Sequence, residues 1–159
     1  MRHAGSMALC IDKITGSRER NPMENCLKVG ILGAGNIAGS MAEALNELQK
    51  EGKACAYAVA SRSQEKALEF ARKWNITRAY SSYEELASDQ EVDLIYIATP
   101  HSLHYEQAKL CMEHGKNVLV EKAFTANARQ AEELFAMAEE KKVFITEAIW
   151  TRYMPSREI

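Results

Sequence analysis

A glycine-rich segment near the start of the chain has the residue types and spacing of a dinucleotide-binding turn. It reads Gly33-Ala34-Gly35-Asn36-Ile37-Ala38. Gly33 allows a tight turn, Gly35 lets a pyrophosphate approach the backbone, and Ala38 allows a helix to pack closely on a strand. A helix that starts at this point would offer its N–H groups and its dipole to the phosphates. The alternative is a glycine-rich turn without a ligand. The candidate cofactor contacts in this segment are Gly33, Gly35, Asn36 and Ile37.

Ser61 and Arg62 follow the next apolar stretch, where an NAD enzyme usually carries Asp or Glu for the ribose 2′-hydroxyl. The stretch ends Ala60-Ser61-Arg62-Ser63, and no carboxylate comes before Glu65. The Arg62 guanidinium can stack on adenine and pair with a 2′-phosphate, and serine hydroxyls can donate to the same group. The segment therefore favours NADP over NAD. The alternative is a solvated arginine at a helix start, which the helix dipole slightly disfavours.

A third segment combines helix-start residues with two histidines. Thr99 suits an N-cap and Pro100 the first helical turn, which alone would explain both residues. His101 and His104 lie three residues apart on one helix, so a metal pair is conceivable, but no third ligand has convincing spacing and we expect no metal. A histidine with satisfied hydrogen bonds, or one that faces the cofactor, fits better. The candidate cofactor contacts in this third segment are Ala98, Thr99, Pro100, His101 and His104.

Glu121 and Lys122 follow an apolar run that ends at Val120. Because parallel strands end on one edge of a sheet, and that edge also holds the glycine turn, we expect both residues beside the nicotinamide end of a bound cofactor. A lysine near a reacting carbonyl can polarise it, position the substrate and join in proton transfer. Lys122 is therefore the candidate catalytic residue. The alternative is an exposed ion pair at a strand end, which is common and contributes little.

Short apolar runs alternate with helical patterns from residue 27 onward. We expect strands at 27–32, 54–60, 77–80, 93–98, 117–120 and 143–146, and helices at about 37–48, 67–74, 83–87, 102–114 and 128–138. Such alternation implies parallel pairing with right-handed crossovers. The near-continuous apolar strands agree, because a parallel sheet is covered on both faces. The prediction is an α/β Rossmann domain over residues 23–150, a doubly wound parallel sheet of about six strands with helices on both faces.

The bulk composition excludes some classes of partner. A length of 159 residues suffices for one domain with a full core. A net charge of −2 gives no electrostatic case for nucleic acid or an anionic membrane. No apolar run approaches the roughly 18 residues that span a bilayer. The four cysteines, Cys10, Cys26, Cys55 and Cys111, lack ligand spacing, so we expect reduced thiols in a cytoplasmic protein.

The two ends of the chain differ from the patterned region. Residues 1–22 hold glycines, a proline and several charges without a sustained period, and we expect a mobile leader that is vector-derived or mis-assigned. The alternative is a natural extension that packs on the domain. Residues 151–159 are expected to begin a second domain that is not part of this chain.

Taken together, these segments resemble the glucose–fructose oxidoreductase and inositol dehydrogenase family (Gfo/Idh/MocA). The resemblance runs from about Lys28 to Pro155. It also includes Tyr83-Glu84-Glu85-Leu86, Tyr96-Ile97-Ala98-Thr99-Pro100-His101 and the stretch from Gly115 to Lys122. Ser61-Arg62 and the closing segment from Glu147 to Tyr153 look most like the subgroup of dihydrodiol dehydrogenases and NADP-linked D-xylose dehydrogenases.

The resemblance implies hydride transfer between a nicotinamide and a sugar, cyclitol or diol carbon. It places Lys122 near the reacting oxygen, and it gives Thr99, Pro100 and His104 a part in shaping the cofactor site. It also leads the chain past the cofactor at Trp150 and Arg152 into a second domain.

One residue departs from the family pattern. The family has proline after its lysine, whereas this chain has Ala123, which loosens the constraint on Lys122. Without the second domain, which would cover the nicotinamide, apolar surface would be uncovered, and we expect a homo-oligomer.

Two other functions stay open at this point. The chain could be a non-catalytic NADP-binding module that senses redox state or assembles with a partner. A methyltransferase-like or nucleotide-sugar domain would share the α/β architecture, but it would not predict the Glu121-Lys122 pair or the Ala60-Ser61-Arg62 segment.

Overall fold

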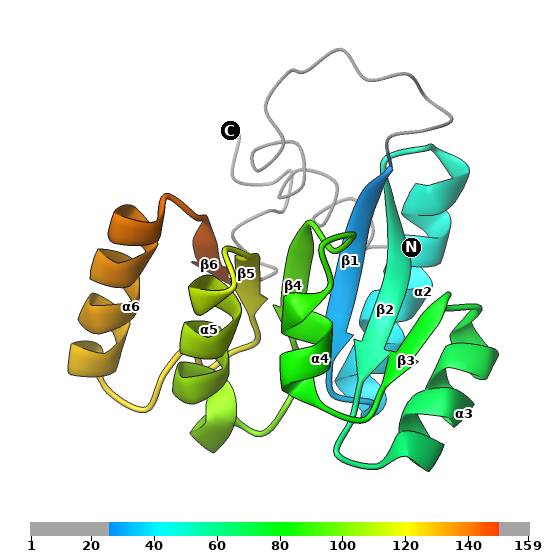
Figure 1. Cartoon of the computed structure of the whole chain (residues 1–159), viewed down its shortest axis with the longest axis horizontal. Coiled ribbons are helices and arrows are strands. Elements are labelled where there is room, and N and C mark those ends of the chain that lie inside the picture. The colour runs from blue at the N-terminus through cyan, green and yellow to red at the C-terminus, as the bar shows by residue number, and fades with distance from the viewer. Residues whose placement is uncertain (1–25, 150–159) are drawn as a thin grey trace.

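Residues 26–149, the part of the chain that the computed structural model describes, form a six-stranded sheet with helices on both faces (Figure 1). The strands are β1 (Leu27–Leu32), β2 (Ala54–Ala60), β3 (Arg78–Tyr80), β4 (Leu94–Ile97), β5 (Asn117–Val120) and β6 (Ile145–Glu147). The helices are α2 (Asn36–Lys50), α3 (Gln64–Trp74), α4 (Tyr83–Ser88), α5 (His104–Glu113) and α6 (Ala128–Lys141). A short 3-10 turn, η1 (His101–Leu103), precedes α5. The predicted fold class is confirmed.

The order of the strands creates a switch point in the middle of the sheet. All neighbouring strands are parallel, and their order is β3-β2-β1-β4-β5-β6. The chain runs outward from β1 through β2 and β3, and then crosses to the other side of β1 to form β4. Where the direction reverses, a crevice opens outside the carboxyl ends of the strands, and α/β proteins bind ligands there.

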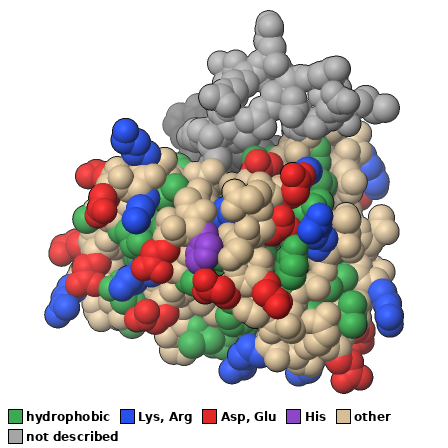
Figure 2. Space-filling view, viewed as in Figure 1, with side chains coloured by type: hydrophobic (Ala, Val, Ile, Leu, Met, Phe, Trp, Pro, Cys, Tyr) green, Lys and Arg blue, Asp and Glu red, His purple; other side chains and the backbone are tan. Residues whose placement is uncertain are grey.

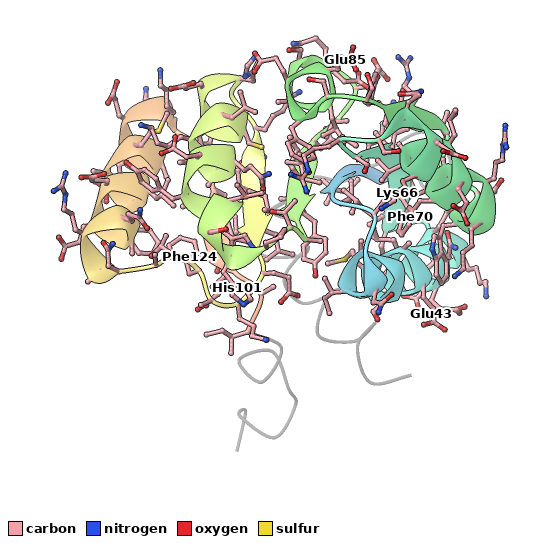
Figure 3. The ribbon with its side chains drawn as sticks, turned by 90° about the horizontal axis from the view of Figure 1, so that it is seen from below. Glu43, Lys66, Phe70, Glu85, His101 and Phe124 are labelled. Atoms are coloured by element: carbon pink, nitrogen blue, oxygen red, sulfur yellow. The ribbon has the colours of Figure 1, made fainter. Side chains whose placement is uncertain are left out.

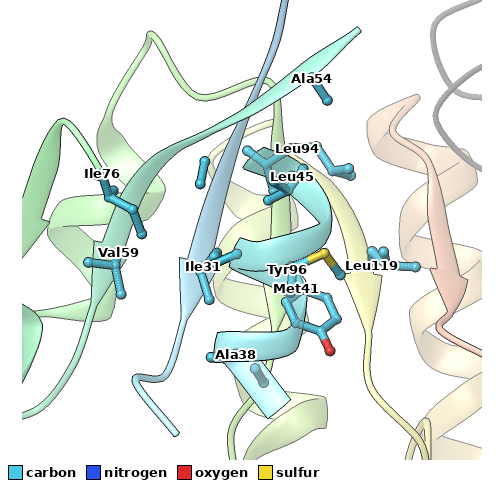
Figure 4. Close-up of a cluster of buried hydrophobic side chains, with 14 of the residues drawn as sticks. Ile31, Ala38, Met41, Leu45, Ala54, Val59, Ile76, Leu94, Tyr96 and Leu119 are labelled. Atoms are coloured by element: carbon cyan, nitrogen blue, oxygen red, sulfur yellow. The ribbon is translucent and has the colours of Figure 1, made fainter. Parts of the chain in front are cut away.

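The sheet is buried between two layers of helices. Helices α2 and α3 cover one face, and α4, α5 and α6 cover the other (Figure 1). All four residues of β4 are buried, which is why its sequence is apolar without alternation. Figure 4 shows the cluster under α2, where Ile31, Leu45 and Tyr96 meet. Each large aliphatic side chain buried there contributes about 1.5–3 kcal/mol. The packed sheet thus holds the loops at its edge in fixed positions relative to one another.

Side chains that cap the first turn determine where three of the helices begin. Ser63 accepts from the Lys66 N–H, Ser82 from the Glu84 and Glu85 N–H groups, and Asn127 from the Gln130 N–H. Each such cap contributes about 1 kcal/mol, because it satisfies a donor that the helix itself cannot pair. These helices therefore start at fixed distances from the strands that precede them.

The sixth strand begins two residues later than predicted, at Ile145 in place of Val143. Lys142 ends α6 in the left-handed conformation, with φ of 55°. The Val143 N–H then donates to the Ala138 carbonyl at 3.1 Å and completes the last helical turn. The predicted start of the strand was wrong because Val143, a residue type that favours strands, has its N–H bonded to the end of the helix.

Acidic and basic side chains are mixed on the face drawn in Figure 2, in keeping with 22 acidic and 20 basic residues in the chain. Within residues 26–149, no helix combines the length and the apolar character needed to cross a membrane.

Asp89 is a hydrogen-bonding hub at the end of α4, with a side chain that is 7% exposed. Its carboxylate accepts a hydrogen bond from the Tyr80 hydroxyl at 2.8 Å and another from the Glu91 N–H at 3.0 Å. Burial by itself would raise the pKa of Asp89. The two hydrogen bonds and the charges of Arg78 and Lys116 outweigh this effect and hold the pKa below its ordinary value of 3.8. The ionised carboxylate therefore stabilises the fold.

We predict a pH-dependent loss of stability for Asp89→Asn. Because the folded state lowers the pKa of this carboxyl, its stabilisation is complete above the unfolded pKa and disappears as the pH falls through the folded pKa. The free energy of unfolding should drop by about 1.5–3 kcal/mol at pH 7, the scale of hydrogen bonds to a charged group. Urea denaturation should show this difference shrinking below about pH 4. Glu139→Gln, an exposed site on α6, is the control. An Asp89→Asn difference that is equal at pH 7 and pH 3 would contradict the assignment.

Candidate functional site

The four segments singled out by their chemistry meet along one edge of the sheet. The strand register aligns Leu32 with Ala60 on one side and with Ile97 on the other, and Ile97 with Val120. The residue after each of these begins one of the segments: Gly33, Ser61, Ala98 and Glu121. The prediction that these strand ends share an edge is confirmed. Figure 3 looks onto this edge from below, with Lys66 and His101 labelled on it.

Gly33 occupies a position that requires glycine. Its φ is +104°, and a Cβ added to it would lie 2.8 Å from the carbonyl oxygen of Ala98. Its N–H donates to the Ala60 carbonyl at 2.9 Å, so the residue is anchored between the ends of β2 and β4. Both the left-handed conformation and the close contact exclude a side chain. The turn therefore follows the strand directly, as the sequence predicts.

The start of α2 is left open, in contrast to α3, α4 and α6. Gly35 is its N-cap and offers no side chain to the first N–H groups. A Cβ at Gly35 would meet no atom within 4 Å, and Gly35, Asn36 and Ile37 are all exposed. The first turn carries no acidic residue. A phosphate group would suit this place, which combines first-turn N–H groups that no described side chain caps, the positive end of the helix dipole and open space.

The segment after β2 offers donors without a carboxylate. The Ser61 N–H bonds to the Tyr80 carbonyl at 3.2 Å, which holds the segment against β3. The Ser61 and Ser63 hydroxyl oxygens accept from backbone N–H groups, so their own hydrogens remain available to a ligand. Arg62 is exposed, and within residues 26–149 its guanidinium takes part in no ion pair. This arrangement matches what a 2′-phosphate needs.

A groove of about 470 Å³ between α2 and α3 adds a cation that was not predicted from the sequence. Gly35 and Asn36 line it from the start of α2, and Lys66 lines it from the first turn of α3. Further along, the groove is lined by Lys73 and by two carboxylates, Glu43 and Glu69. Gly39 permits the close helix contact, since a Cβ there would lie 3.3 Å from the Trp74 ring. Lys66 thus stands on the same side as the phosphate turn. The signal in the sequence was a lysine four residues after Arg62, in a helical turn where a cation is slightly disfavoured.

Two expectations for the segment after β4 were wrong. Thr99 is not an N-cap, and Pro100 is not in the first helical turn. Pro100 is extended with ψ of 141°, and a 3-10 turn separates it from α5. The Thr99 hydroxyl donates to the Gln107 side chain one turn into α5 in place of a backbone N–H. The Thr99 carbonyl also contacts the ring of His104, so both polar groups of Thr99 are bonded to side chains of α5.

His104 is fully buried and joins two loops of the site. Its Nε2 lies 2.9 Å from the Thr99 carbonyl oxygen, and its Nδ1 lies 2.8 Å from that of Ala123. Carbonyl oxygens only accept, so a ring nitrogen donates to its carbonyl when it carries the hydrogen, and the tautomer decides which one does. Neither nitrogen is left for a metal, and His104 therefore shapes the site from beneath without facing it. His101, which packs edge-on against it at 5.7 Å, is exposed.

Glu121 is held by a tyrosine that was not predicted as a site residue. The Tyr96 hydroxyl donates to Glu121 Oε1 at 2.5 Å, and the Lys122 N–H donates to Oε2 at 3.1 Å. The Glu121 N–H itself bonds to the Ile97 carbonyl at 3.0 Å. Within residues 26–149 no ion pair joins Glu121 to Lys122, so the alternative of an exposed ion pair does not describe this site.

Lys122 is exposed at the carboxyl edge, and the turn that carries it is anchored on both sides. The peptide bond between Lys122 and Ala123 is cis. After it, the Phe124 N–H donates to Glu147 Oε1 at 2.8 Å, which ties the turn to the end of β6. Glu147 is a further residue of the site region that was not predicted from the sequence. Within residues 26–149 the Lys122 amine thus forms no ion pair, and the backbone on either side of it is anchored.

Some of the predicted contacts lie outside the described residues. Trp150 and Arg152 belong to this group and stay predictions. Within residues 26–149, no group of three or more His, Cys, Asp or Glu side chains could hold a metal ion.

Comparison with a family model supports the arrangement. Residues 27–148 match the Gfo/Idh/MocA model, described as an oxidoreductase family with an NAD-binding Rossmann fold.

Individual relatives and a solved structure agree with this match. The chain is 44% identical to trans-1,2-dihydrobenzene-1,2-diol dehydrogenase of Mus musculus over 132 residues, 83% of this chain and 39% of the mouse protein. It is 41% identical to D-xylose 1-dehydrogenase (NADP(+)) of Hypocrea jecorina over 138 residues, 81% of this chain and 35% of the fungal protein. A 3-ketoreductase from Actinomadura kijaniata, solved with NADP, has a TM-score of 0.76 and 31% identity, with 84% of this chain and 42% of that chain covered. The chain thus spans less than half the length of these proteins.

The two glycines of the turn should respond differently to alanine. Gly33→Ala should lower the free energy of unfolding by about 2–4 kcal/mol, from left-handed strain and from overlap with the Ala98 carbonyl. Gly35→Ala is the matched control and should cost less than about 1 kcal/mol, because its conformation and surroundings accept a Cβ. Urea denaturation of both variants measures the difference. Equal losses would contradict the requirement for glycine at position 33.

Proposed function

The chain belongs to the Gfo/Idh/MocA oxidoreductase family, and on that premise we propose that its carboxyl edge binds NADP for a dehydrogenase acting on a sugar, cyclitol or diol CH–OH group. The observation that carries the proposal is the common register of four strand ends. It brings the phosphate turn, the Ser61-Arg62 segment, the Thr99 loop and Lys122 to one edge. A nicotinamide dinucleotide has chemical groups for each of these segments.

The preference for NADP is proposed from the chemistry around Arg62. No carboxylate stands between the end of β2 and Glu65 to receive a ribose 2′-hydroxyl, whereas Arg62, Ser61 and Lys66 could all donate to a phosphate. The names of two compared proteins point the same way. The fungal D-xylose dehydrogenase is named for NADP(+), and the ketoreductase was solved with NADP.

The nicotinamide, when bound, gives or takes the hydride, and Lys122 is proposed to act on the substrate oxygen. Its amine is exposed at the carboxyl edge, free of ion pairs with residues 26–149. There it would hold the hydroxyl or carbonyl oxygen by a hydrogen bond and stabilise the charge that develops as the carbon changes oxidation state. The backbone is anchored before Lys122 by the Glu121 N–H and after it by the Phe124 N–H, which limits where the amine can reach.

Self-association and a cytoplasmic location are also part of the proposal. Five large apolar side chains in the described region are exposed to solvent: Ile37, Leu68, Phe135, Phe144 and Ile149. A contact between copies of the chain would cover such groups.

Replacement of Arg62 should separate the two cofactors. We expect Arg62→Ala to weaken NADPH binding by about 1.5–3 kcal/mol, the scale of hydrogen bonds to a charged group, and to leave NADH binding nearly unchanged. Fluorescence titration of both cofactors measures this. Arg72→Ala, at an exposed arginine in the last turn of α3, serves as the control and should change neither affinity. Equal losses for NADPH and NADH after Arg62→Ala would reject this role for Arg62.

Replacement of Lys122 should affect turnover and spare cofactor affinity. We expect Lys122→Met to lower kcat/KM by about 10²–10⁴-fold, the usual contribution of a positioned proton-transfer group. NADP affinity should stay nearly constant.

The assay for this prediction should supply the rest of a relative's chain. The matched region makes up 39% of the mouse diol dehydrogenase, so this chain can replace that region in a fusion with the rest of the mouse enzyme. Pentoses and diols are the substrates to offer. Lys141→Met, at an exposed lysine on α6, is the control. Full activity of the Lys122→Met fusion would show that the catalytic assignment is wrong.

A further inference from the structure

Glu121 lies between a buried phenol and the lysine proposed for chemistry. Its Oε1 accepts from the Tyr96 hydroxyl at 2.5 Å, and its Oε2 accepts from the backbone N–H of Lys122 at 3.1 Å. Both oxygens are engaged away from the Lys122 amine. Although this carboxylate is next to Lys122 in the sequence, no ion pair within residues 26–149 involves Lys122.

A carboxylate released beside Lys122 would compete with the substrate for the amine. Opposite charges within about 4–6 Å attract and favour the ammonium form, and the carboxylate would occupy its donors. A lysine paired in this way is less available to hold a substrate oxygen or to exchange a proton with it. Whatever holds Glu121 therefore also decides how free Lys122 is.

Tyr96 has the placement and the chemistry to hold this carboxylate. Its side chain is 1% exposed and packs with Met41 and Leu119, while its hydroxyl points out of that cluster (Figure 4). Burial first, and then the Glu121 carboxylate, raise the pKa of Tyr96 far above its ordinary value of 10, so the hydroxyl keeps its proton and donates. A phenylalanine ring would fill the same space. The hydroxyl is therefore not needed for packing.

We propose that Tyr96 is a positioning residue for Lys122, which holds the Glu121 carboxylate so that the neighbouring amine stays free for an oxygen atom of the substrate. That the Lys122 amine binds a substrate oxygen rests on the function proposed above. The arrangement itself concerns only Tyr96, Glu121 and Lys122, and it is testable on the chain without any substrate.

The test is the acetylation of Lys122 by a limiting amount of N-hydroxysuccinimidyl acetate. Mass spectrometry of the digested chain gives the labelling of Lys122 relative to Lys141, an exposed lysine at the end of α6. We expect Tyr96→Phe to lower this ratio about three- to tenfold, because the released carboxylate favours the unreactive ammonium form of Lys122. The double variant Tyr96→Phe with Glu121→Gln should return the ratio to the wild-type value. A purely structural role for Tyr96 would not be rescued by the second substitution.

Two results would overturn the proposal when Tyr96→Phe folds. The first is an unchanged ratio in Tyr96→Phe, and the second is a lowered ratio that Glu121→Gln does not restore. Lys116, which is buried at 6% exposure, reports folding in the same spectra, because it labels readily only if the chain opens.

The single variant Glu121→Gln decides the matter even if Tyr96→Phe does not fold. With Tyr96 in place the ratio should stay at its wild-type value, because the carboxylate is already held away from Lys122. A clear rise would show that Glu121 restrains Lys122 in the wild type, and the proposal would fail. An NADP titration of the same samples tests the proposed function separately, because lack of binding would overturn that function and leave the labelling result intact.

Discussion

The parallel hydrogen-bond register across β2, β1, β4 and β5 is the constraint on which the site depends. It places Ala60, Leu32, Ile97 and Val120 in one row, so four segments that are distant in sequence begin beside one another. Because side chains alternate along a strand, a shift of one residue in any pair would move each side chain to the opposite face of the sheet. Both faces are packed against helices, so such a shift would disrupt the packing of two buried clusters at once. The packing of the core thus fixes the strand register, and the register fixes the positions of the four segments at the carboxyl edge.

Buried polar side chains just beneath that edge form hydrogen bonds to the loops of the site. His104 and Gln107 are 0% and 6% exposed, and both bind the Thr99 segment. No buried side-chain nitrogen or oxygen within residues 26–149 lacks a hydrogen-bond partner. Unsatisfied polar groups would be costly at this depth, so each bond restrains the loop that provides its partner. The loops are thereby held near one arrangement before any ligand arrives, which favours binding.

Local patterns were enough to predict the strands, the helices and the glycine turn, because their causes are local. Gly33 needs a positive φ, and the apolar runs need two buried faces. The failures came from side-chain contacts that no periodicity encodes. Thr99 was taken for a helix cap, but its carbonyl contacts the ring of His104 and its hydroxyl donates to Gln107, five and eight residues further along the chain. In the sequence, Tyr96 looks like one more residue of an apolar strand. Its hydrogen-bond partner Glu121 is 25 positions away. No periodicity indicates such a pairing.

The central claim is that the carboxyl edge of this domain binds NADP. Its most direct test is a titration of the isotope-labelled chain with NADP⁺, followed by amide nitrogen–proton correlation spectra. The account predicts saturable shifts at Gly35, Asn36, Arg62 and Lys122, which lie along that edge. The signals of Asp93 and Lys116, at the opposite ends of β4 and β5, should remain in place. Absence of saturable shifts, or shifts gathered at Asp93 and Lys116, would contradict it.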